Sequence, residues 1–148
     1  MEAWEPVVRE QVRDAIAAYN FAGDRGRLDG LAACFAPQGV LVLHEGSRFD
    51  GRDAIRDGLA ARLNREPGDD RPLPSHVHHH VSSTFFQSVG ELEVICRSYY
   101  LVTTQVGVDH WGRYHDTLVP DADPGEDRWV FVERRVTADG FHEQSLFG

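Results

Sequence analysis

Residues 76–85, His-Val-His-His-His-Val-Ser-Ser-Thr-Phe, mark the point where the sequence changes from a helical to an extended pattern. Before this stretch, apolar residues recur three or four positions apart, which is typical of helices that pack on one side. After it, extended segments alternate with short groups of turn-forming residues. The first long strand is therefore predicted to begin here, and the remainder of the chain is predicted to be sheet.

The same reading divides the whole chain into elements. Helices are expected at 4–22, 27–35 and 52–64, a hairpin over 40–49, and long strands at 77–88, 92–106, 113–119 and 128–137. The turns between the long strands are expected at Gly90, 109–112 and 121–127. Because these turns are short, neighbouring strands are expected to pair antiparallel.

Helices gathered at the start and strands gathered at the end indicate an α+β fold with the helices on one face of the sheet. A long curved sheet that closes over helices leaves a tapering cavity, and such a cavity is the usual place for a small-molecule site. The length of 148 residues is that of one domain, which is expected to span residues 1–148.

The composition argues against several classes of partner. The formal net charge is −9 and no basic run offsets it, so no nucleic acid and no anionic membrane surface is expected as a partner. No apolar run approaches the roughly 20 residues of a membrane span, and the acidic N-terminus does not have the order of a signal peptide. We therefore expect a cytoplasmic protein. Cys34 and Cys96 lie in apolar patterns, which favours buried thiols over a disulfide.

Strand periodicity singles out one histidine of the 76–85 stretch. Side chains on a strand alternate between two faces, and the more apolar set is Val77, His79, Val81, Ser83 and Phe85. This set is predicted to face the cavity, which makes His79 a candidate base and Ser83 and Phe85 candidate substrate contacts. A carboxylate beside such a histidine fixes its tautomer and allows base catalysis near neutral pH. The alternative is a buried histidine satisfied by a backbone group.

Asp24, which follows the first helix, is the best candidate for that carboxylate. The alternative for Asp24 is a helix cap for the helix that starts near residue 27. His78 and His80 share the other face of the strand and could bind a metal, but no nearby Glu or Cys completes a set, so no metal is expected. The chain contains no glycine-rich nucleotide loop and no Gly-x-Ser-x-Gly motif, so no cofactor is expected either.

Several short motifs resemble those of SnoaL-like proteins in the nuclear transport factor 2-like superfamily. They follow the order of the family over nearly the whole chain: Tyr19-Asn20, Asp24-Arg25-Gly26, Phe35-Ala36-Pro37, residues 51–55, residues 79–83, residues 112–116 and residues 129–135. The resemblance implies a cystatin-like cone of curved mixed or antiparallel sheet wrapped around three N-terminal helices. It also implies a homodimer that forms through the open face of the sheet.

The resemblance extends to site residues. In the dehydratase and dehydrochlorinase branches an aspartate after the first helix orients a histidine on the first long strand, and Asp24 and His79 fall on those positions. A second pocket histidine of the dehydratase branch falls near His115, beside the pocket candidate Tyr114. Tyr19 lies near the tyrosine position of that branch, whereas Ser83 stands where the family usually has asparagine.

These observations lead to two hypotheses. The first is a cofactor-independent lyase or isomerase of dehydratase or cyclase type, in which His79 removes a proton from a small, mostly apolar ring compound. Asp24 would hold the imidazole, and His115 or Tyr114 would protonate or polarise an oxygen. The second is a non-catalytic module of the same fold, either a ligand-binding protein or a structural subunit like the β chain of aromatic-ring dioxygenases.

Overall fold

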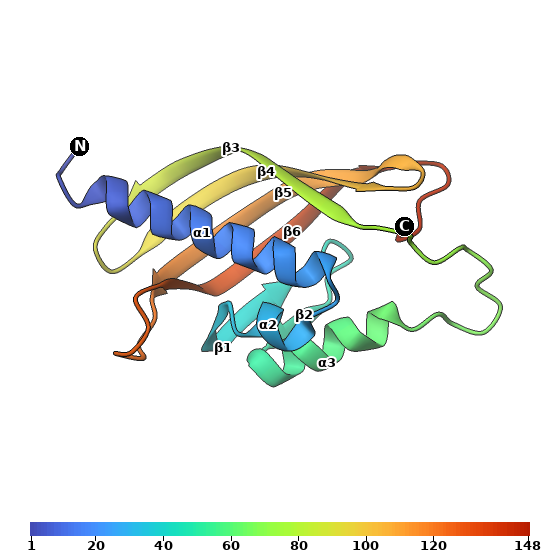
Figure 1. Cartoon of the computed structure of the whole chain (residues 1–148), viewed down its shortest axis with the longest axis horizontal. Coiled ribbons are helices and arrows are strands. Elements are labelled where there is room, and N and C mark those ends of the chain that lie inside the picture. The colour runs from blue at the N-terminus through green and yellow to red at the C-terminus, as the bar shows by residue number, and fades with distance from the viewer.

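A six-stranded mixed sheet forms the body of the protein in the computed structural model, which describes residues 1–148. Three helices accompany it (Figure 1). In chain order the elements are α1 (Glu5–Asp24), α2 (Leu28–Ala32), β1 (Phe35–Val42), β2 (Arg48–Asp50), α3 (Arg52–Leu63), β3 (His78–Val89), β4 (Val94–Thr104), β5 (Gly107–Pro120) and β6 (Trp129–Phe141). The α+β class expected from the sequence is confirmed.

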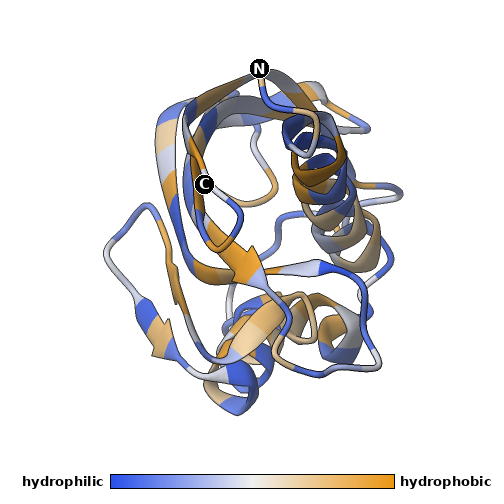
Figure 2. Cartoon of the chain, turned by 90° about the vertical axis from the view of Figure 1, so that its left-hand side faces the viewer, coloured by the Kyte–Doolittle hydropathy of each residue, from blue (hydrophilic) through white to orange (hydrophobic).

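The strands lie in the order β2-β1-β6-β5-β4-β3. The long strands β3 to β6 pair antiparallel in sequence order, as their short connections predict. The first strand β1 returns beside the last strand β6 and pairs with it in parallel, which makes the sheet mixed. The sheet stays open, with β2 and β3 at its edges, and curves around the interior (Figures 1 and 2).

Helix α1 lies across the concave face of the sheet, and α2 and α3 lie below it beside β1 and β2 (Figure 1). Pro6 fits the first turn of α1, where no intrahelical N–H donor is needed. The main apolar core forms where α1 meets the sheet, and its fully buried members include Val12, Phe35, Leu41 and Phe131. None of the three helices combines the length and apolarity that a membrane span requires.

An irregularity in β3 changes which side chains face inward. Strict alternation predicted Ser83 and Phe85 on the cavity side, and this prediction is wrong. Ser83 has a positive φ of 52°, and the pairing with β4 shifts register between Ser82 and Phe85. The extra residue of this bulge reverses the facing of the strand after it. Phe85 is therefore 65% exposed on the outer face, and Phe86 packs against the core instead.

The turn between β4 and β5 lies earlier than the sequence suggested. Gln105 and Val106 form it, and β5 already begins at Gly107, whose φ is 98°. Glycine adopts this backbone conformation without steric cost, so it allows the tight reversal. Asp109 to Gly112, predicted to be a turn, are consequently part of a strand. This correction matters because it brings Asp109 and His110 onto the sheet.

Candidate functional site

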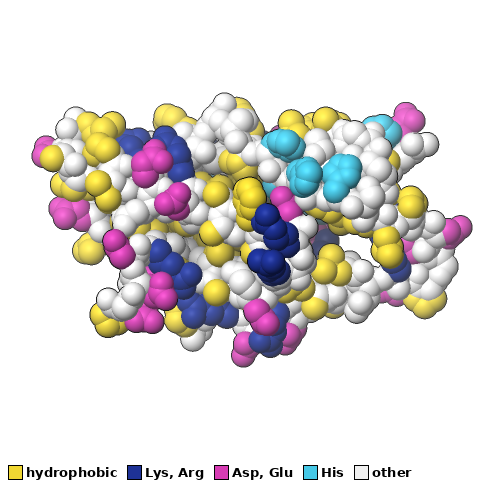
Figure 3. Space-filling view, in the orientation of Figure 1, with side chains coloured by type: hydrophobic (Ala, Val, Ile, Leu, Met, Phe, Trp, Pro, Cys, Tyr) yellow, Lys and Arg dark blue, Asp and Glu magenta, His cyan; other side chains and the backbone are white.

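A cavity of about 780 Å³ opens between the concave face of the sheet, the end of α1, and α3 with the loop that follows it. Its apolar lining residues include Leu28 and Leu31 from the helical side and Val102 and Phe141 from the sheet. In the space-filling view, histidine side chains gather beside a hollow on this face of the molecule, and arginine side chains lie at its edge (Figure 3). Polar and charged side chains, among them Asp24, His79 and His110, make up about half of the lining residues. A cavity that combines apolar walls with polar groups is the usual form of a small-molecule site.

The carboxylate of Asp24 holds His79 at two points. Its Oδ1 lies 2.5 Å from Nδ1 of the His79 ring, and its Oδ2 accepts a hydrogen bond of 3.1 Å from the His79 backbone N–H. Both side chains are mostly buried, with exposed fractions of 14% for Asp24 and 22% for His79. Because Nδ1 is held by the carboxylate, Nε2 is the ring nitrogen left for a ligand in the cavity that His79 lines.

The alternative role for Asp24 is not observed. Asp24 is the last residue of α1, and the residue that precedes α2 at its N-cap is Arg27. No side chain caps α2 through a hydrogen bond. The carboxylate instead points to β3, where it contacts His79, 55 residues away in sequence. His79 is the histidine that the alternation of side chains along the strand had singled out.

The histidine of a second histidine–aspartate pair lines the same cavity. On β5, Nδ1 of His110 lies 2.7 Å from Oδ1 of Asp109, and the His110 ring lines the cavity. Burial lowers the pKa of His110 below its ordinary value of 6.5, and the nearby His79 and His44 act in the same direction. Asp109 opposes this shift without reversing it. His110 is therefore held in its neutral form more strongly than a free histidine.

Sequence reasoning missed this pair because residues 109–112 were assigned to a turn. The sequence signal that could have found it is Gly107, which follows Val106. A glycine at this position allows a short turn after β4 and therefore a longer strand after it. On the longer β5, His110 and Tyr114 then share a face.

The other predicted site residues divide between the cavity and the outer face of the sheet. Tyr19 on α1 and Tyr114 on β5 are buried and line the cavity. His115 does not: it alternates with Tyr114 along β5 and lies opposite the exposed Arg97 on β4. Burial and the charges of Arg97 and Arg113 lower the pKa of His115. The placement of His115 in the pocket is thus wrong, because strand alternation directs it to the outer face.

A buried ion pair supports the tyrosine side of the cavity. Arg134 on β6 donates two hydrogen bonds to Asp116 on β5, of 2.8 and 2.9 Å, and both side chains are fully buried. Burial alone would lower the pKa of Arg134, but the Asp116 carboxylate raises it above its ordinary value. The guanidinium carbon lies 3.7 Å from the ring centroid of Tyr114 and 4.4 Å from that of Tyr19. The pair therefore fixes both rings.

The hydroxyl groups of the tyrosines differ in availability. Tyr100 donates its hydroxyl to the backbone carbonyl of Thr137, whereas Tyr114 has no hydrogen-bond partner for its hydroxyl within the protein. Burial raises the pKa of Tyr114 well above its ordinary value. Its hydroxyl consequently stays protonated and can donate to an oxygen of a ligand.

Histidines 78 and 80 lie exposed on the outer side of the edge strand β3. His80 contacts the hydroxyl of Thr103 through Nε2, and the rings of His76 and His78 lie 5.1 Å apart. The structure contains no group of three or more His, Cys, Asp or Glu side chains arranged to hold a metal ion.

The family model of the SnoaL-like domain matches residues 7–135 of the sequence. The chain belongs to the SnoaL-like domain family. The resemblance noted from the short motifs is thereby confirmed. No curated protein matches the sequence.

Solved structures share the fold. A candidate scytalone dehydratase from Novosphingobium aromaticivorans superposes with a TM-score of 0.77 at 21% identity, over 97% of this chain and 91% of that chain. ActVI-ORFA from Streptomyces coelicolor gives a TM-score of 0.71 at 22% identity, over 89% and 97%. A protein of unknown function with a cystatin-like fold from Nostoc punctiforme gives 0.71 at 19% identity, over 88% and 90%. At these identities the likeness establishes the cystatin-like fold, and the family supports a ligand-binding or cyclase- or isomerase-type domain.

Proposed function

We propose that this protein is a cofactor-independent lyase or isomerase that acts on a small, mostly apolar ring compound, with His79 as its general base. The observation that carries the proposal is the contact between Asp24 and His79 at the wall of a large cavity that has both apolar and polar lining residues. A base needs an unprotonated nitrogen directed at the substrate and a partner that stabilises its charged form. Asp24 supplies the partner, and Nε2 of His79 is the free nitrogen.

The reaction would begin with transfer of a proton from a carbon beside a carbonyl group to Nε2 of His79. The electron pair of the broken C–H bond moves toward the carbonyl oxygen, where the hydroxyl of Tyr114 can donate a hydrogen bond. His79 becomes an imidazolium whose charge faces the Asp24 carboxylate. This step needs no oxidant or reductant.

The proton on His79 then has two possible destinations. Returned to another carbon, it completes an isomerisation; given to a leaving hydroxyl group, it completes a dehydration that releases water. Either outcome restores neutral His79 and balances the reaction. His110, neutral and with Nδ1 on Asp109, presents a second acceptor nitrogen that can bind a substrate hydroxyl group.

The test does not require the natural substrate. The full-length protein is incubated in D₂O with a panel of ring ketones and of hydroxylated or halogenated ring compounds, and NMR follows the exchange of carbon-bound protons and the loss of water or halide. We expect turnover of at least one compound by the wild type and a loss of about 10²–10⁴-fold in His79→Gln.

The matched control is His80→Gln, the exposed neighbour on the other face of β3, which we expect to leave turnover unchanged. Equal turnover by wild type and His79→Gln would overturn the proposal. Compounds that bind in the cavity without any exchange or elimination would instead support a non-catalytic binding module.

We also propose that the protein forms a homodimer through the outer face of the sheet. The outer face carries exposed aromatic side chains on adjacent strands, Phe85, Tyr99 and Trp111, with exposed fractions of 65%, 58% and 40%. Large exposed apolar side chains of this kind are typical of interaction surfaces. Sedimentation of the wild type and of Tyr99→Glu tests this point: a monomeric wild type would contradict it.

A further inference from the structure

The carboxylate of Asp109 is a fully buried acceptor for four donors. Oδ1 faces Nδ1 of His110 at 2.7 Å and accepts from the Ser145 hydroxyl at 2.6 Å. Oδ2 accepts from the Leu146 backbone N–H at 2.8 Å and from the Thr104 hydroxyl at 3.3 Å. Burial acts to raise the pKa of Asp109, but these hydrogen bonds outweigh it and hold the pKa below its ordinary value.

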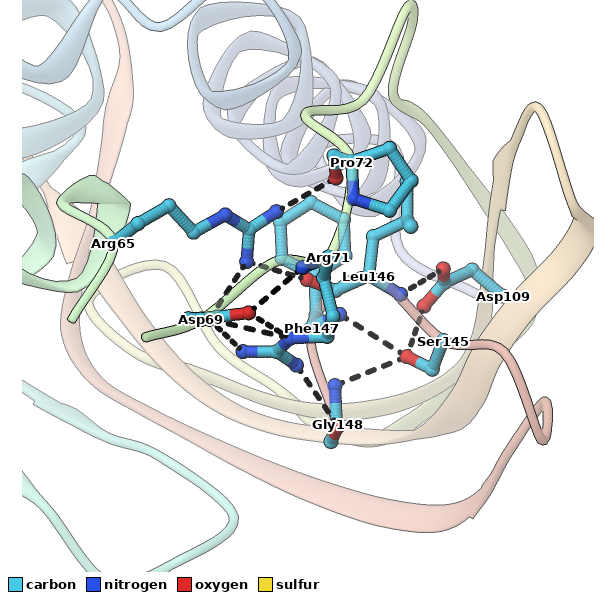
Figure 4. Close-up of polar contacts among 9 residues, drawn as sticks. All are labelled: Arg65, Asp69, Arg71, Pro72, Asp109, Ser145, Leu146, Phe147 and Gly148. Atoms are coloured by element: carbon cyan, nitrogen blue, oxygen red, sulfur yellow. Dashed lines mark hydrogen bonds and ion pairs between the residues drawn. The ribbon is translucent and has the colours of Figure 1, made fainter. Parts of the chain in front are cut away.

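Two of the four donors come from residues 142–148, which we call the C-terminal strap. Figure 4 shows the strap between Asp109 on one side and the loop after α3 on the other. Asp109 also holds the first residue of the strap, because its backbone carbonyl accepts a 2.7 Å hydrogen bond from the N–H of His142. Leu146 is only 1% exposed and forms part of the cavity wall, and the ring of Phe147 meets the edge of the His110 ring. The strap therefore covers His110 as well as holding its aspartate.

The loop after α3, residues 65–72, fastens the strap from its other side. Arg65 donates to the carbonyl of Leu146 and Arg71 donates to the carbonyl of Gly148, both at 3.0 Å. Asp69 lies between the two arginines, 2.7 Å from Arg71 and 3.6 Å from Arg65. Both arginines are thus directed at backbone carbonyls of the strap, and Figure 4 shows these polar contacts continuing through Ser145 to Asp109. Asp109 in turn contacts His110.

We infer that Asp109 and Ser145 are positioning residues for His110, so that the C-terminal strap must be docked for His110 to direct a neutral Nε2 into the cavity. This inference rests on the proposed function in which His110 binds a substrate group. Ser145 is 6% exposed and its hydroxyl faces the same Asp109 oxygen as the His110 ring. The charge of that oxygen is shared between the two donors, which limits how strongly it stabilises a protonated His110.

The groups that face His110 come from four elements. Asp109 adjoins it on β5, His79 faces it from β3, His44 from the turn after β1, and Tyr100 from β4, with ring centroids 6.2 Å apart. Two of these four groups are histidines, whose charges disfavour a second charge on His110. Without the Ser145 hydroxyl, His110 is the only side chain that contacts Asp109 Oδ1, and the strap that covers His110 is held less firmly. Both changes favour the protonated ring, so the pKa of His110 is expected to rise.

The experiment is an NMR titration of the full-length protein labelled with ¹⁵N in its imidazole rings, with His110 assigned from the spectrum of His110→Gln. In the wild type we expect the tautomer protonated on Nδ1 and a midpoint below 6.5 for His110. In Ser145→Ala we expect the midpoint to rise by about half to one pH unit, the size expected for loss of one hydrogen bond. Ser145→Thr, which keeps a hydroxyl, is expected to restore the wild-type value.

Ser88→Ala, an exposed serine on β3, is the matched control, and the ring signals of His115 on the outer face are the internal reference. An unchanged His110 midpoint and tautomer in Ser145→Ala would overturn the inference. A shift of His110 and His115 together would do so as well, because it would report a general loosening of the fold. The titration contains no substrate, so it can fail while turnover by His79 stands, and turnover can fail while the titration succeeds.

Discussion

Replacement of Asp24 by asparagine is the most direct test of how the site is built. The side chain keeps its shape but loses its charge, and one of its two acceptor oxygens becomes an N–H₂ donor. In the structure both oxygens are used as acceptors, one for Nδ1 of His79 and one for the His79 backbone N–H. If the amide oxygen keeps the backbone N–H, the amide nitrogen faces Nδ1. The ring must then carry its proton on Nε2, and the cavity loses its base.

The expected loss of turnover follows from these two effects. A hydrogen bond to a charged group contributes about 1.5–3 kcal/mol, which corresponds to roughly 10- to 150-fold in rate when the imidazolium forms. The limited exposure of the pair, 14% and 22%, means that solvent screens this contribution only in part. The reversed tautomer adds to the loss, up to the limit of about 10²–10⁴-fold for general base catalysis. We therefore expect Asp24→Asn to lose about 10²-fold or more.

The assay is the exchange and elimination reaction in D₂O described for His79, with rates measured at saturating and at limiting substrate. The effect is expected in the maximal rate, because the imidazolium exists only along the reaction. Asp29→Asn is the matched control, since the Asp29 side chain is 90% exposed and its nearest cation, Arg56, is 3.7 Å away. A loss below about threefold in Asp24→Asn, with a folded protein, would refute the reasoning that Asp24 supports His79 as the base.

Three further predictions concern the surroundings of the site. Asp116→Asn leaves the fully buried Arg134 guanidinium without its counter-charge, so we expect it to lower the free energy of unfolding in urea by about 3–5 kcal/mol. The double variant Asp116→Leu with Arg134→Met removes both charges and is expected to lower it much less. Equal losses in the two variants would contradict this account. Because burial lowers the pKa of His110, the unfolded state binds its proton more readily, so stability is expected to fall as the pH drops below 6.5. Thermal melts above and below that pH should show a smaller fall in His110→Gln, and an identical fall would count against the buried neutral ring. Gly112→Ala is expected to lower the melting temperature strongly, because a Cβ there collides with the backbone carbonyl of Thr137; a melt like that of the wild type would show that β5 and β6 can separate locally.

The order of elements could be predicted from the sequence because it depends on local periodicity. Helical spacing before residue 76 and strand spacing after it were sufficient for the α+β class and for antiparallel pairing of the long strands. The parity of the 76–85 stretch singled out His79, and the irregularity of β3 begins only after it. Asp24 could be named as a candidate from its place after the first helix and from the family resemblance, but its contact with His79 could not be derived, because nothing local relates residues 55 positions apart.

The wrong predictions for Ser83 and Phe85 and the missed His110 arise from irregularities of the strands. A bulge or a turn moved by a few residues reverses the facing of every later side chain on a strand, since the period is two. The positive φ of Ser83 sent Phe85 to the outer face, and the early turn at 105–106 brought His110 onto β5. His115 was expected in the pocket from the family resemblance alone, and it lies on the outer face because it alternates with Tyr114 along β5.

What the sequence determined by itself is therefore the set of elements, their order, and one histidine on the first long strand, because each of these depends on near neighbours in the chain. The tertiary structure decided which carboxylate meets that histidine, which second histidine shares its cavity, and how residues 142–148 reach Asp109. These contacts join segments far apart in the chain, and strand register with backbone irregularities sets them, neither of which composition or periodicity records.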